Sequence, residues 1–486
     1  MSDQSLIAKD AASLQSALRV GEVSPLDLLD ALEDRIAEVD GDVNAVVTEC
    51  FDRAREHAQQ LLKKAPGERG LLQGLPVAIK DLEPVAGVRS TWGSPIFSDF
   101  IPSESDCLVE QVESNGGVIY AKVNTPEFGA GANTFNEVFG RTANPWDTSK
   151  SCAGSSGGSA VALATGTAWL ASGSDLGGSL RNPASFCSIV GFRPSPGRVA
   201  HGAARPGAYP SALGGMPNDP FGVAGPMARN VPDVALLLDA MVGYHDADPI
   251  SLPREAESYT AAVAARRLPR KVAFSPDLGV TPVHPEVAAI CERAARKFEE
   301  LGVPVEEAHP DFTDIQDIFQ TNRAISFYVS KKGLLDNYRE LLKPEVIWNI
   351  ERAGDVSMDE ILRVEKARTA YLARATAFFR EYDLLLSPAT IVAPYPIEER
   401  YLARLGDHEF SNYIEWCSIA YAITITGFPA MSVPAGFTED GLPVGLQMVG
   451  GPRGEANLLS AANLYEEAMG LKDLLPIRPR VQGPTS

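Results

Sequence analysis

SCAGSSGGS at 151–159 and GSDLGGSLR at 173–181 flank the apolar run AVALATGTAWLA at 160–171. Glycine lets the backbone approach a ligand closely and adopt positive φ. Each loop can therefore turn its N–H groups inward around a serine hydroxyl, and such a nest stabilises an anion. The apolar run has the length of one short helix and one strand, so we expect the two loops to flank these two elements.

Short strands alternate with helices on both sides of these loops. The strand-like segments PVAIK (76–80) and VIYAKVN (118–124) are separated by glycine-rich turns and by a predicted helix over 106–115, which ends at Gly116-Gly117. This alternation predicts an α/β fold in which a mixed central β-sheet is covered by helices on both faces.

The 486 residues would suffice for about three domains, but large α/β enzymes often form one body. We expect one continuous domain built from four segments. They are an N-terminal helical arm (1–65), the first part of the core with the catalytic residues (66–245), a helix-rich insertion or cap (246–415) and the C-terminal part of the core (416–486).

The insertion has two predicted parts. KVAFS (271–275), a helix over about 285–301 and VPVEEA (303–308) have the pattern of a βαβ-like unit. Residues 310–382 are predicted to be helical with charges on exposed faces. The stretch 310–415 is therefore our candidate for a cap over the site.

Composition and charge exclude several classes of protein. The chain has a formal net charge of −20 and no run of clustered Lys and Arg, which argues against a nucleic-acid surface. Its start lacks a basic segment followed by an apolar stretch, and no window reaches the roughly 18 apolar residues of a membrane span. We expect a cytoplasmic protein that binds neither nucleic acid nor membranes and is a monomer or a homodimer.

The cysteines and histidines lack metal-binding spacing. Six cysteines are spread along the chain without a CxxC pair, and six histidines show no HExxH pattern. We therefore expect free, mostly buried thiols, with no metal and no cofactor.

The Gly/Ser stretches allow other interpretations. A flexible linker is disfavoured because an apolar run interrupts the tract, and a phosphate loop would need GxxxxGK[ST]. GSSGG (154–158) fits the GxSxG elbow of α/β-hydrolases, which would make Ser156 the nucleophile. That alternative also needs a downstream histidine, and His245, His284 and His309 lack any surrounding signature.

Several longer motifs resemble the amidase signature family when taken together. They are GLPVAIKD (74–81), GSSGGSA (154–160), GSDLGGSLRNPASFCSIVGFRPSPGRV (173–199), GPMARNVPDVALLLDAM (225–241) and TGFPAMSVPAGFTEDGLPVGLQMVG (426–450). The likeness covers nearly the whole chain and is weakest over 250–410. It implies an amide hydrolase of the family's fold that acts on a small-molecule amide.

The resemblance also implies the site residues by matching position. The nucleophile falls on Ser179, the cis-peptide serine that relays the proton on Ser155, and the base on Lys80. The resemblance places the oxyanion hole at the backbone N–H groups of Leu176, Gly177, Gly178 and Ser179. Supporting residues are Ser156, Asp175 and Arg181, and we expect the last two to brace the loop rather than react.

Three positions depart from the family's pattern. Leu176 stands where Thr is usual and Ala153 where Gly is common. The Leu176 change leaves the chemistry intact, since that position contributes only its backbone. Asn182 stands where an apolar residue is usual, which affects the expected contacts with substrate.

Lys80 must be shifted to act as a base. At pH 7 a lysine with a pKa near 10.4 is neutral only about one time in 2,500. Burial at the end of the apolar VAIK strand could bring the pKa of Lys80 near ~7.5, at a cost of ~4 kcal/mol to the charged form. We expect Asp81 to point to the opposite face of the strand, away from the Lys80 amine. VAIK also occurs in kinases, but the other kinase motifs are missing.

Three functions remain open from the sequence. The first is a stand-alone hydrolase of small or aryl amides, extending to carbamates or cyclic amides. The second is the glutaminase component of a tRNA-dependent amidotransferase, which needs a partner protein and from which 310–415 and TWGSPIFSDF (91–100) differ. The third is a catalytically silent scaffold, which the intact Lys80, Ser155 and Ser179 disfavour.

The substrate pocket cannot be assigned from the sequence. Aromatic residues that either line an apolar pocket or fill the core are Phe128, Phe135, Phe327, Tyr328 and Trp416. Because such side chains pack in the core more often than they bind ligands, we expect the core role for each.

Overall fold

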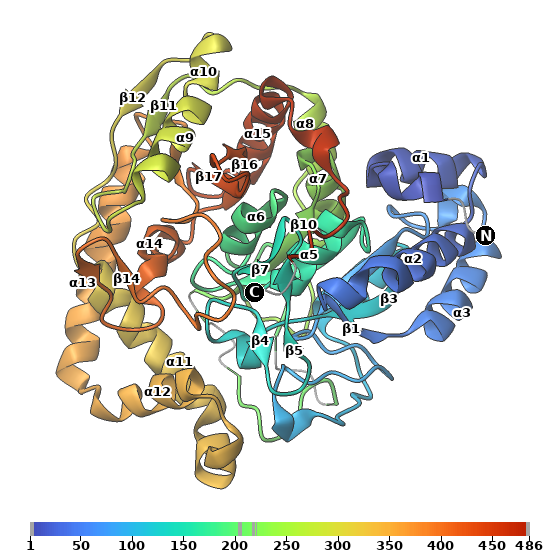
Figure 1. Ribbon diagram of the computed structural model, residues 1–486, viewed down its shortest axis with the longest axis horizontal. Helices are drawn as coiled ribbons and strands as arrows, with labels where there is room; N and C mark the ends of the chain where they lie inside the picture. Colours follow the sequence, from blue (N-terminus) through green and yellow to red (C-terminus); the bar gives the residue numbers. More distant parts are fainter. Residues whose placement is uncertain (1–3, 203–206, 216–218, 220, 483–486) are drawn as a thin grey trace.

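The computed structural model describes residues 4–202, 207–215, 219 and 221–482, and one large sheet runs through the middle of it (Figure 1). Its eleven strands follow the order β1 (Val46–Glu49), β3 (Val118–Val123), β2 (Pro76–Lys80), β8 (Leu170–Asp175), β10 (Val223–Ala228), β9 (Val190–Arg193), β16 (Ala430–Phe437), β17 (Pro443–Gly450), β13 (Leu384–Pro388), β11 (Val272–Phe274) and β12 (Val305–Glu307).

The sheet is mixed, as predicted. β3, β2 and β8 are parallel neighbours at one end, and β13, β11 and β12 are parallel at the other. The strands between β8 and β13 pair antiparallel, and so does the edge strand β1. Short two-stranded ladders add β4 (Phe135–Asn136) with β5 (Gly140–Arg141), β6 (Ala143–Asn144) with β7 (Asp147–Ser151), and β14 (Arg404–Leu405) with β15 (His408–Glu409).

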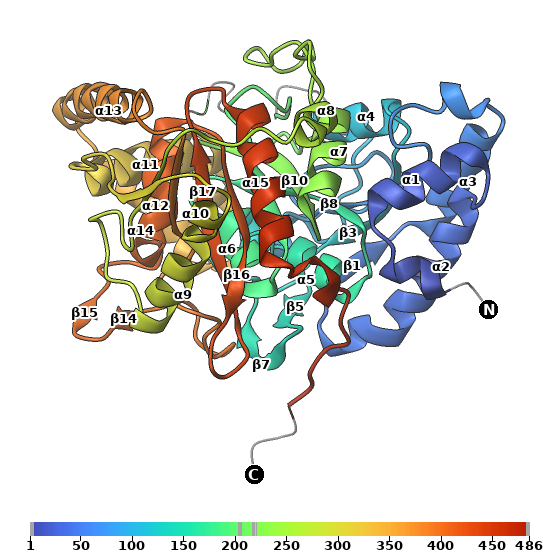
Figure 2. The ribbon, with the colours of Figure 1, turned by 90° about the horizontal axis from the view of Figure 1, so that it is seen from above.

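Helices cover both faces of this sheet, which confirms the predicted fold class (Figure 2). They are α4 (Cys107–Ser114), α5 (Gly157–Thr165), α6 (Arg181–Cys187), α7 (Val231–Met241), α8 (Tyr259–Ala264), α9 (Pro285–Ala295), α10 (Lys297–Glu300), α14 (Ser418–Thr426) and α15 (Glu455–Met469). α5 and α6 pack against each other and against the sheet, whereas α15 packs on α7 and α8.

The N-terminal segment contains α1 (Ala11–Val20), α2 (Pro25–Val39) and α3 (Phe51–Leu62). α2 begins with a capping box in which the Ser24 side chain and Asp27 bond reciprocally, with Pro25 at the first turn. The segment is not helical throughout, because it also supplies β1 at the edge of the sheet. Its apolar side chains share one core cluster with the sheet, so the arm is packed on the main body.

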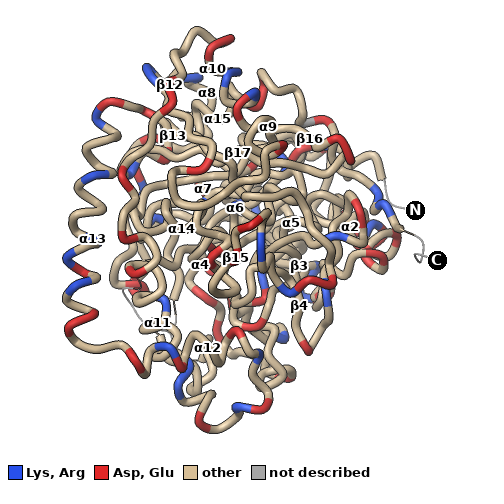
Figure 3. Tube along the Cα trace, turned by 60° about the vertical axis from the view of Figure 1, so that its left-hand side comes forward, with Lys and Arg blue, Asp and Glu red and all other residues tan. Residues whose placement is uncertain are grey.

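Long helices α11 (Ile315–Tyr338), α12 (Pro344–Arg352) and α13 (Met358–Phe378) lie on the side of the molecule opposite α1–α3 (Figures 1 and 2). α13 alternates acidic and basic residues along its exposed length, whereas the central elements carry few charges (Figure 3). Nearby, β11 and β12 pair in parallel on either side of α9 and α10 in the chain, which is a βαβ arrangement.

The buried core contains most of the cysteines. All six are free thiols, and each is buried except the half-buried Cys50. The described residues contain no helix long and apolar enough to cross a membrane. They also contain no cluster of three or more His, Cys, Asp or Glu side chains that would hold a metal ion.

Candidate active site

Lys80 ends the buried strand β2 in the parallel part of the sheet. Its side chain is fully buried, and its Nζ donates to the hydroxyls of Ser155 at 2.7 Å, Ser156 at 2.9 Å and Ser174 at 2.9 Å. No carboxylate lies within ion-pair distance of this amine among the described residues. The amine is therefore surrounded by hydroxyls alone.

Burial determines the charge state of the Lys80 amine. Loss of solvent lowers the pKa of Lys80 to about 7, although the nearby carboxylates of Glu83 and Asp175 oppose this change. The same burial raises the pKa of Glu83, which the positive charge of Lys80 partly offsets. The predicted direction for Lys80 and its physical cause thus both agree with the structure.

Asp81 follows Lys80 but points elsewhere, as predicted. Its carboxylate accepts from Lys122 Nζ at 2.9 Å and from the Thr91 hydroxyl at 2.5 Å. Lys122 lies on β3 and is fully buried as well. A second lysine therefore neutralises Asp81, and the Lys80 amine keeps only hydroxyl partners.

The first Gly/Ser loop leads into α5. The peptide bond between Gly154 and Ser155 is cis, which agrees with the position of the family's cis-peptide serine. The helix starts after Ser156 and packs closely on the chain beyond β3, because a Cβ at Gly158 would lie 2.2 Å from the backbone nitrogen of Asn124. Glycine at this position therefore lets the loop bring Ser155 and Ser156 to Lys80.

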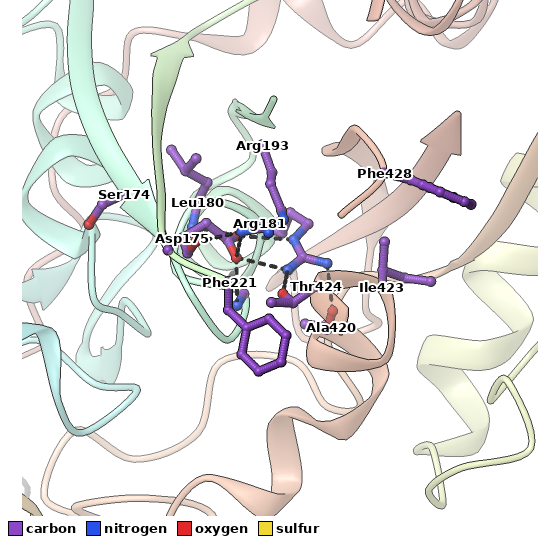
Figure 4. Close-up of polar contacts among 12 residues, drawn as sticks. Ser174, Asp175, Leu180, Arg181, Arg193, Phe221, Ala420, Ile423, Thr424 and Phe428 are labelled. Carbon is purple, nitrogen blue, oxygen red and sulfur yellow. Dashed lines mark hydrogen bonds and ion pairs between the residues drawn. The ribbon is translucent and has the colours of Figure 1, made fainter. Parts of the chain in front are cut away.

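The second Gly/Ser loop connects β8 to α6 and carries Ser179. Asp175 closes β8, and its carboxylate accepts N–H groups from Gly178 at 3.0 Å and Leu180 at 3.1 Å (Figure 4). Gly178 has φ +108°, and a Cβ there would lie 2.6 Å from the Cβ of Ala420. The loop is thus a tight turn around the Asp175 carboxylate.

Asp175 and Arg181 fix this loop to the rest of the sheet. Arg181 Nε and Nη2 donate to the Asp175 carboxylate at 3.0 Å and 2.9 Å, and Arg193 Nη1 lies 3.3 Å from its Oδ1 (Figure 4). Burial alone would raise the pKa of Asp175, but Arg181 and Arg193 outweigh it and hold this pKa well below its usual value. The carboxylate therefore stays ionised as a brace.

Arg181 extends this brace to the C-terminal part of the chain. Its Nη1 donates to the Gln447 Oε1 at 2.6 Å and to the carbonyl of Ala420 at 2.7 Å, and its Nη2 donates to Thr424 Oγ1 at 3.0 Å. β17 and α14 supply these partners. The predicted bracing role of Asp175 and Arg181 agrees with these contacts.

The predicted set of oxyanion donors needs one correction. The N–H of Gly178 already donates to Asp175 Oδ1, because the carboxylate at the centre of the turn requires donors of its own. The N–H groups of Leu176, Gly177 and Ser179 make no hydrogen bond within the described part of the chain. Three of the four predicted donors are therefore available to a bound anion.

A cavity of about 220 Å³ opens onto both loops. Ser155 and Ser179 line it, and the backbone of the two loops meets where the N–H of Ser156 donates to the carbonyl of Ser179 at 3.2 Å. Ser156 is fully buried outside this lining, with its hydroxyl held by Lys80 and by the N–H of Ser174. This geometry disfavours Ser156 as the nucleophile of a GxSxG elbow.

The aromatic residues divide between the cavity and other environments. Phe128 and Phe327 line the cavity, contrary to the expectation that each would fill the core. Phe135 and Trp416 are buried away from the cavity, as expected, whereas Tyr328 is 39% exposed and belongs to neither group. Phe327 and Tyr328 are neighbours on α11, so the rotation of one helix separates the two roles.

Asn182 lies in the cavity wall. Its Nδ2 donates to the Cys417 thiol at 3.3 Å, while its Oδ1 is buried without a partner among the described residues. Leu176 contributes an apolar side chain to the same wall. Both departures from the family's pattern therefore lie beside the candidate nucleophile.

Sequence reasoning missed several residues that complete the site. Ser174 is the third hydroxyl on Lys80, Glu83 lines the cavity, and Arg193 supports Asp175. The only available signal for Ser174 was the alternation of Ser172 and Ser174 along a strand, since residues two apart share a face. Glu83 and Arg193 carried no such signal, because their positions depend on strand pairing.

Comparisons with known proteins agree with this geometry. The family model named Amidase matches residues 27–459. An acylamidase of Rhodococcus erythropolis is 33% identical over 483 residues, covering 98% of both chains. The glutaminase-type chain of the glutamyl-tRNA(Gln) amidotransferase of Moorella thermoacetica is 33% identical over 486 residues, covering 94% of this chain and 96% of that protein.

A solved structure gives the same result for the fold. A bacterial aryl acylamidase of the amidase signature family superposes with a TM-score of 0.86 at 28% identity, over 96% of this chain and 98% of that one. The match extends across the sheet, both Gly/Ser loops and the helices around them. The chain therefore belongs to the amidase signature family, whose members hydrolyse carbon–nitrogen amide bonds.

Proposed function

We propose that the protein is a stand-alone amidase that forms an acyl-enzyme on Ser179, with Ser155 as proton relay and Lys80 as base. One observation carries the proposal above the others. A fully buried lysine amine has serine hydroxyls as its only hydrogen-bond partners in the described structure, and the nearest of them, on Ser155, lines the same cavity as Ser179.

The three hydroxyl partners set the direction of proton transfer. Charged Lys80 donates one N–H to each of Ser155, Ser156 and Ser174. The neutral amine has two N–H groups and one lone pair, so one hydroxyl must donate to the nitrogen instead. Ser155 is the closest at 2.7 Å and opens to the cavity, which makes its hydroxyl the donor. Ser155 in turn accepts the proton of Ser179 as Ser179 Oγ attacks the amide carbon.

The negative charge of the tetrahedral intermediate then meets the loop of residues 176–179. The N–H groups of Leu176, Gly177 and Ser179 are free to donate to it, and the Asp175 brace holds them in place. A preorganised donor of this kind contributes about 3–4 kcal/mol to transition-state stabilisation when it is well placed. This loop is therefore the main electrostatic element of the proposed site.

Collapse of the intermediate releases the amine. Ser155 gives its proton to the leaving nitrogen as the C–N bond breaks, and Lys80 returns a proton to Ser155. Water then attacks the Ser179 ester along the same path, and its proton follows the same relay. The acid leaves and Ser179 recovers its hydroxyl.

The walls of the cavity favour small acyl or aryl groups. Apolar side chains from separate parts of the chain face the site, namely Leu82, Phe128, Leu176, Phe327 and Ile414. With a volume of about 220 Å³ the cavity suits a compact substrate rather than a macromolecule. Anilides, short aliphatic amides and related carbamates or cyclic amides fit this description.

A second candidate is the glutaminase component of a tRNA-dependent amidotransferase. The observation that favours it is the 33% identity to the Moorella thermoacetica amidotransferase chain, the same value as for the acylamidase. Such a protein would need a partner protein for its biological reaction. A stand-alone amidase needs none, so purified protein separates the two.

The test is amine release by the purified chain from anilides, aliphatic amides, carbamates, cyclic amides and glutamine, with Ser179→Ala beside it. We expect turnover of a non-glutamine substrate, with kcat at least about 10³-fold lower in Ser179→Ala. Labelling by a sulfonyl fluoride, located by mass spectrometry, should fall on Ser179. Equal rates in both proteins would refute the nucleophile, and turnover of glutamine alone would favour the second candidate.

A further inference from the structure

Arg323 lies in the wall of the catalytic cavity without an acidic partner. The residue is 5% exposed, and its Nε donates to Asn349 Oδ1 at 2.9 Å and its Nη2 to the Tyr413 hydroxyl at 2.5 Å. Both partners are uncharged. No carboxylate within the described residues forms an ion pair with Arg323.

The guanidinium keeps unused donors on its cavity side. Of its five N–H groups, two are donated to Asn349 and Tyr413, and Nη1 makes no hydrogen bond within the described chain. The rings of Phe319, Phe327 and Tyr413 lie within 5.9 Å of its Cζ, so aromatic faces help to hold the cation. A buried cation without a counter-ion is costly, which points to an anion supplied from outside.

The position of Arg323 on α11 relates it to the reacting loop. Phe319, one turn earlier, touches that loop, since a Cβ at Gly177 would lie 3.2 Å from Phe319 Cζ. Phe327, one turn later, lines the cavity beside Arg323. One face of α11 therefore runs from the oxyanion loop outward and carries the cation about 6 Å further along the helix axis.

Lys331 continues this face by two more turns. Its Nζ lies 4.6 Å from the ring centroid of Phe327, and the residue lines an adjoining cavity of about 390 Å³. Asp219 also lines that adjoining cavity, but it accepts from the Ser326 hydroxyl and from the N–H groups of Phe221 and Gly222. In a chain of net charge −20, two cations thus face the substrate path.

We propose that Arg323 binds a carboxylate of the substrate, so that the preferred amides carry a carboxylate about five bonds from the scissile carbonyl. The length follows from the ~6 Å helical rise and from about 3.5 Å of extended chain for every three bonds. The unused Nη1 and Nη2 donors form the planar edge that binds carboxylates in a bidentate way. This inference rests on the proposed function, because it names the substrate of that same site.

The test uses pairs of amides that differ only in this charge. Glutaric acid monoanilide is compared with 5-methylhexananilide, in which an isopropyl group replaces the carboxylate. N-butyryl-4-aminobutyrate is compared with N-butyryl-4-methylpentylamine, which places the same change on the amine side. We expect kcat/KM to favour the acid at least about 30-fold in one pair.

Substitution of the arginine should remove that preference. Arg323→Met is expected to lower kcat/KM for the preferred acid at least about 30-fold and to leave the neutral amide within about threefold, mainly through KM. Arg339→Met, which removes a surface arginine paired with Glu351, is the matched control and should change neither value. Equal kcat/KM for acid and neutral amide of both pairs in the wild type would overturn the proposal without relying on any variant.

Binding to the inactive Ser179→Ala variant separates this inference from the proposed function. Calorimetric titration should show tighter binding of the acid than of its neutral partner, and the difference should vanish in the double variant with Arg323→Met. If this difference is found but the wild type hydrolyses no amide, the carboxylate site stands and the proposed function fails. If the wild type hydrolyses the neutral amides and no difference in binding exists, the carboxylate site fails and the proposed function stands.

Discussion

Lys122 Nζ lies 2.9 Å from Asp81 Oδ1, and both side chains are buried. This ion pair explains how two lysines on neighbouring strands have different chemistry. Lys122 is held charged by the carboxylate, whereas Lys80, next to Asp81 in sequence, has only hydroxyl partners and loses its preference for the charged form. The contrast makes the two residues a matched pair for experiment.

Substitution by methionine should separate their roles. Lys80→Met is expected to abolish turnover while changing the free energy of unfolding by no more than about 1–2 kcal/mol, since no buried charge loses its partner. Lys122→Met leaves Asp81 buried and unpaired and should cost about 3–5 kcal/mol. Urea unfolding and amine release measure both. An inactive but fully stable Lys122→Met would contradict this division.

The rate should depend on pH through Lys80. Because only the neutral amine accepts a proton, kcat/KM for a neutral amide should rise with pH through about 7 and level off above it. The Glu83 carboxylate raises the pKa of Lys80, so Glu83→Gln should move this rise to lower pH. A rise that stays in place in Glu83→Gln would exclude the electrostatic coupling. A profile without any rise between about pH 5.5 and 8.5 would exclude Lys80 as the base.

The buried brace should matter more than an exposed ion pair of the same type. Asp175→Asn leaves Arg181 and Arg193 without their counter-charge and is expected to cost about 3–5 kcal/mol of unfolding free energy. Asp317→Asn, which removes the exposed partner of Arg363, should cost less than about 1 kcal/mol. Denaturant unfolding of the two variants compares them directly. Similar losses would show that Asp175 is not the electrostatic centre of the loop.

Glutamine should be a poor substrate if Arg323 and Lys331 face the far end of the cavity. Glutaramate has the carboxylate and amide of glutamine but lacks its ammonium group, which the two cations would repel. We expect kcat/KM for ammonia release from glutaramate to exceed that from glutamine by about tenfold or more. A preference for glutamine would instead support the glutaminase alternative.

Local sequence features were sufficient for much of the reacting centre. The buried strand before Lys80 and the glycines around Ser155 and Ser179 act over a few residues, so their conformations can be read from short segments. The same holds for α2, whose start is set by Ser24, Pro25 and Asp27. Gly178 was assigned a donor role because sequence alone does not show that its N–H is already taken by Asp175.

The parts that were missed depend on distant packing. Ser174 meets Lys80 only because β8 pairs in parallel with β2, and Arg323 reaches the cavity only because α11 crosses the oxyanion loop at Phe319. Phe327 and Tyr328 have the same local context but face different surroundings. No periodicity in a helix of mixed polarity fixes which side meets a particular loop.

The contacts from Arg181 to Ala420 and Gln447 span 239 and 266 positions of the chain. Because a polypeptide leaves the ribosome from its N-terminus, every group proposed to react is synthesised long before the partners that steady the loop around Ser179. A nascent chain therefore holds the nucleophile, relay and base without an ordered anion-binding turn. Hydrolysis should begin only when translation is almost finished, which spares the cell a half-made enzyme with an exposed reactive serine.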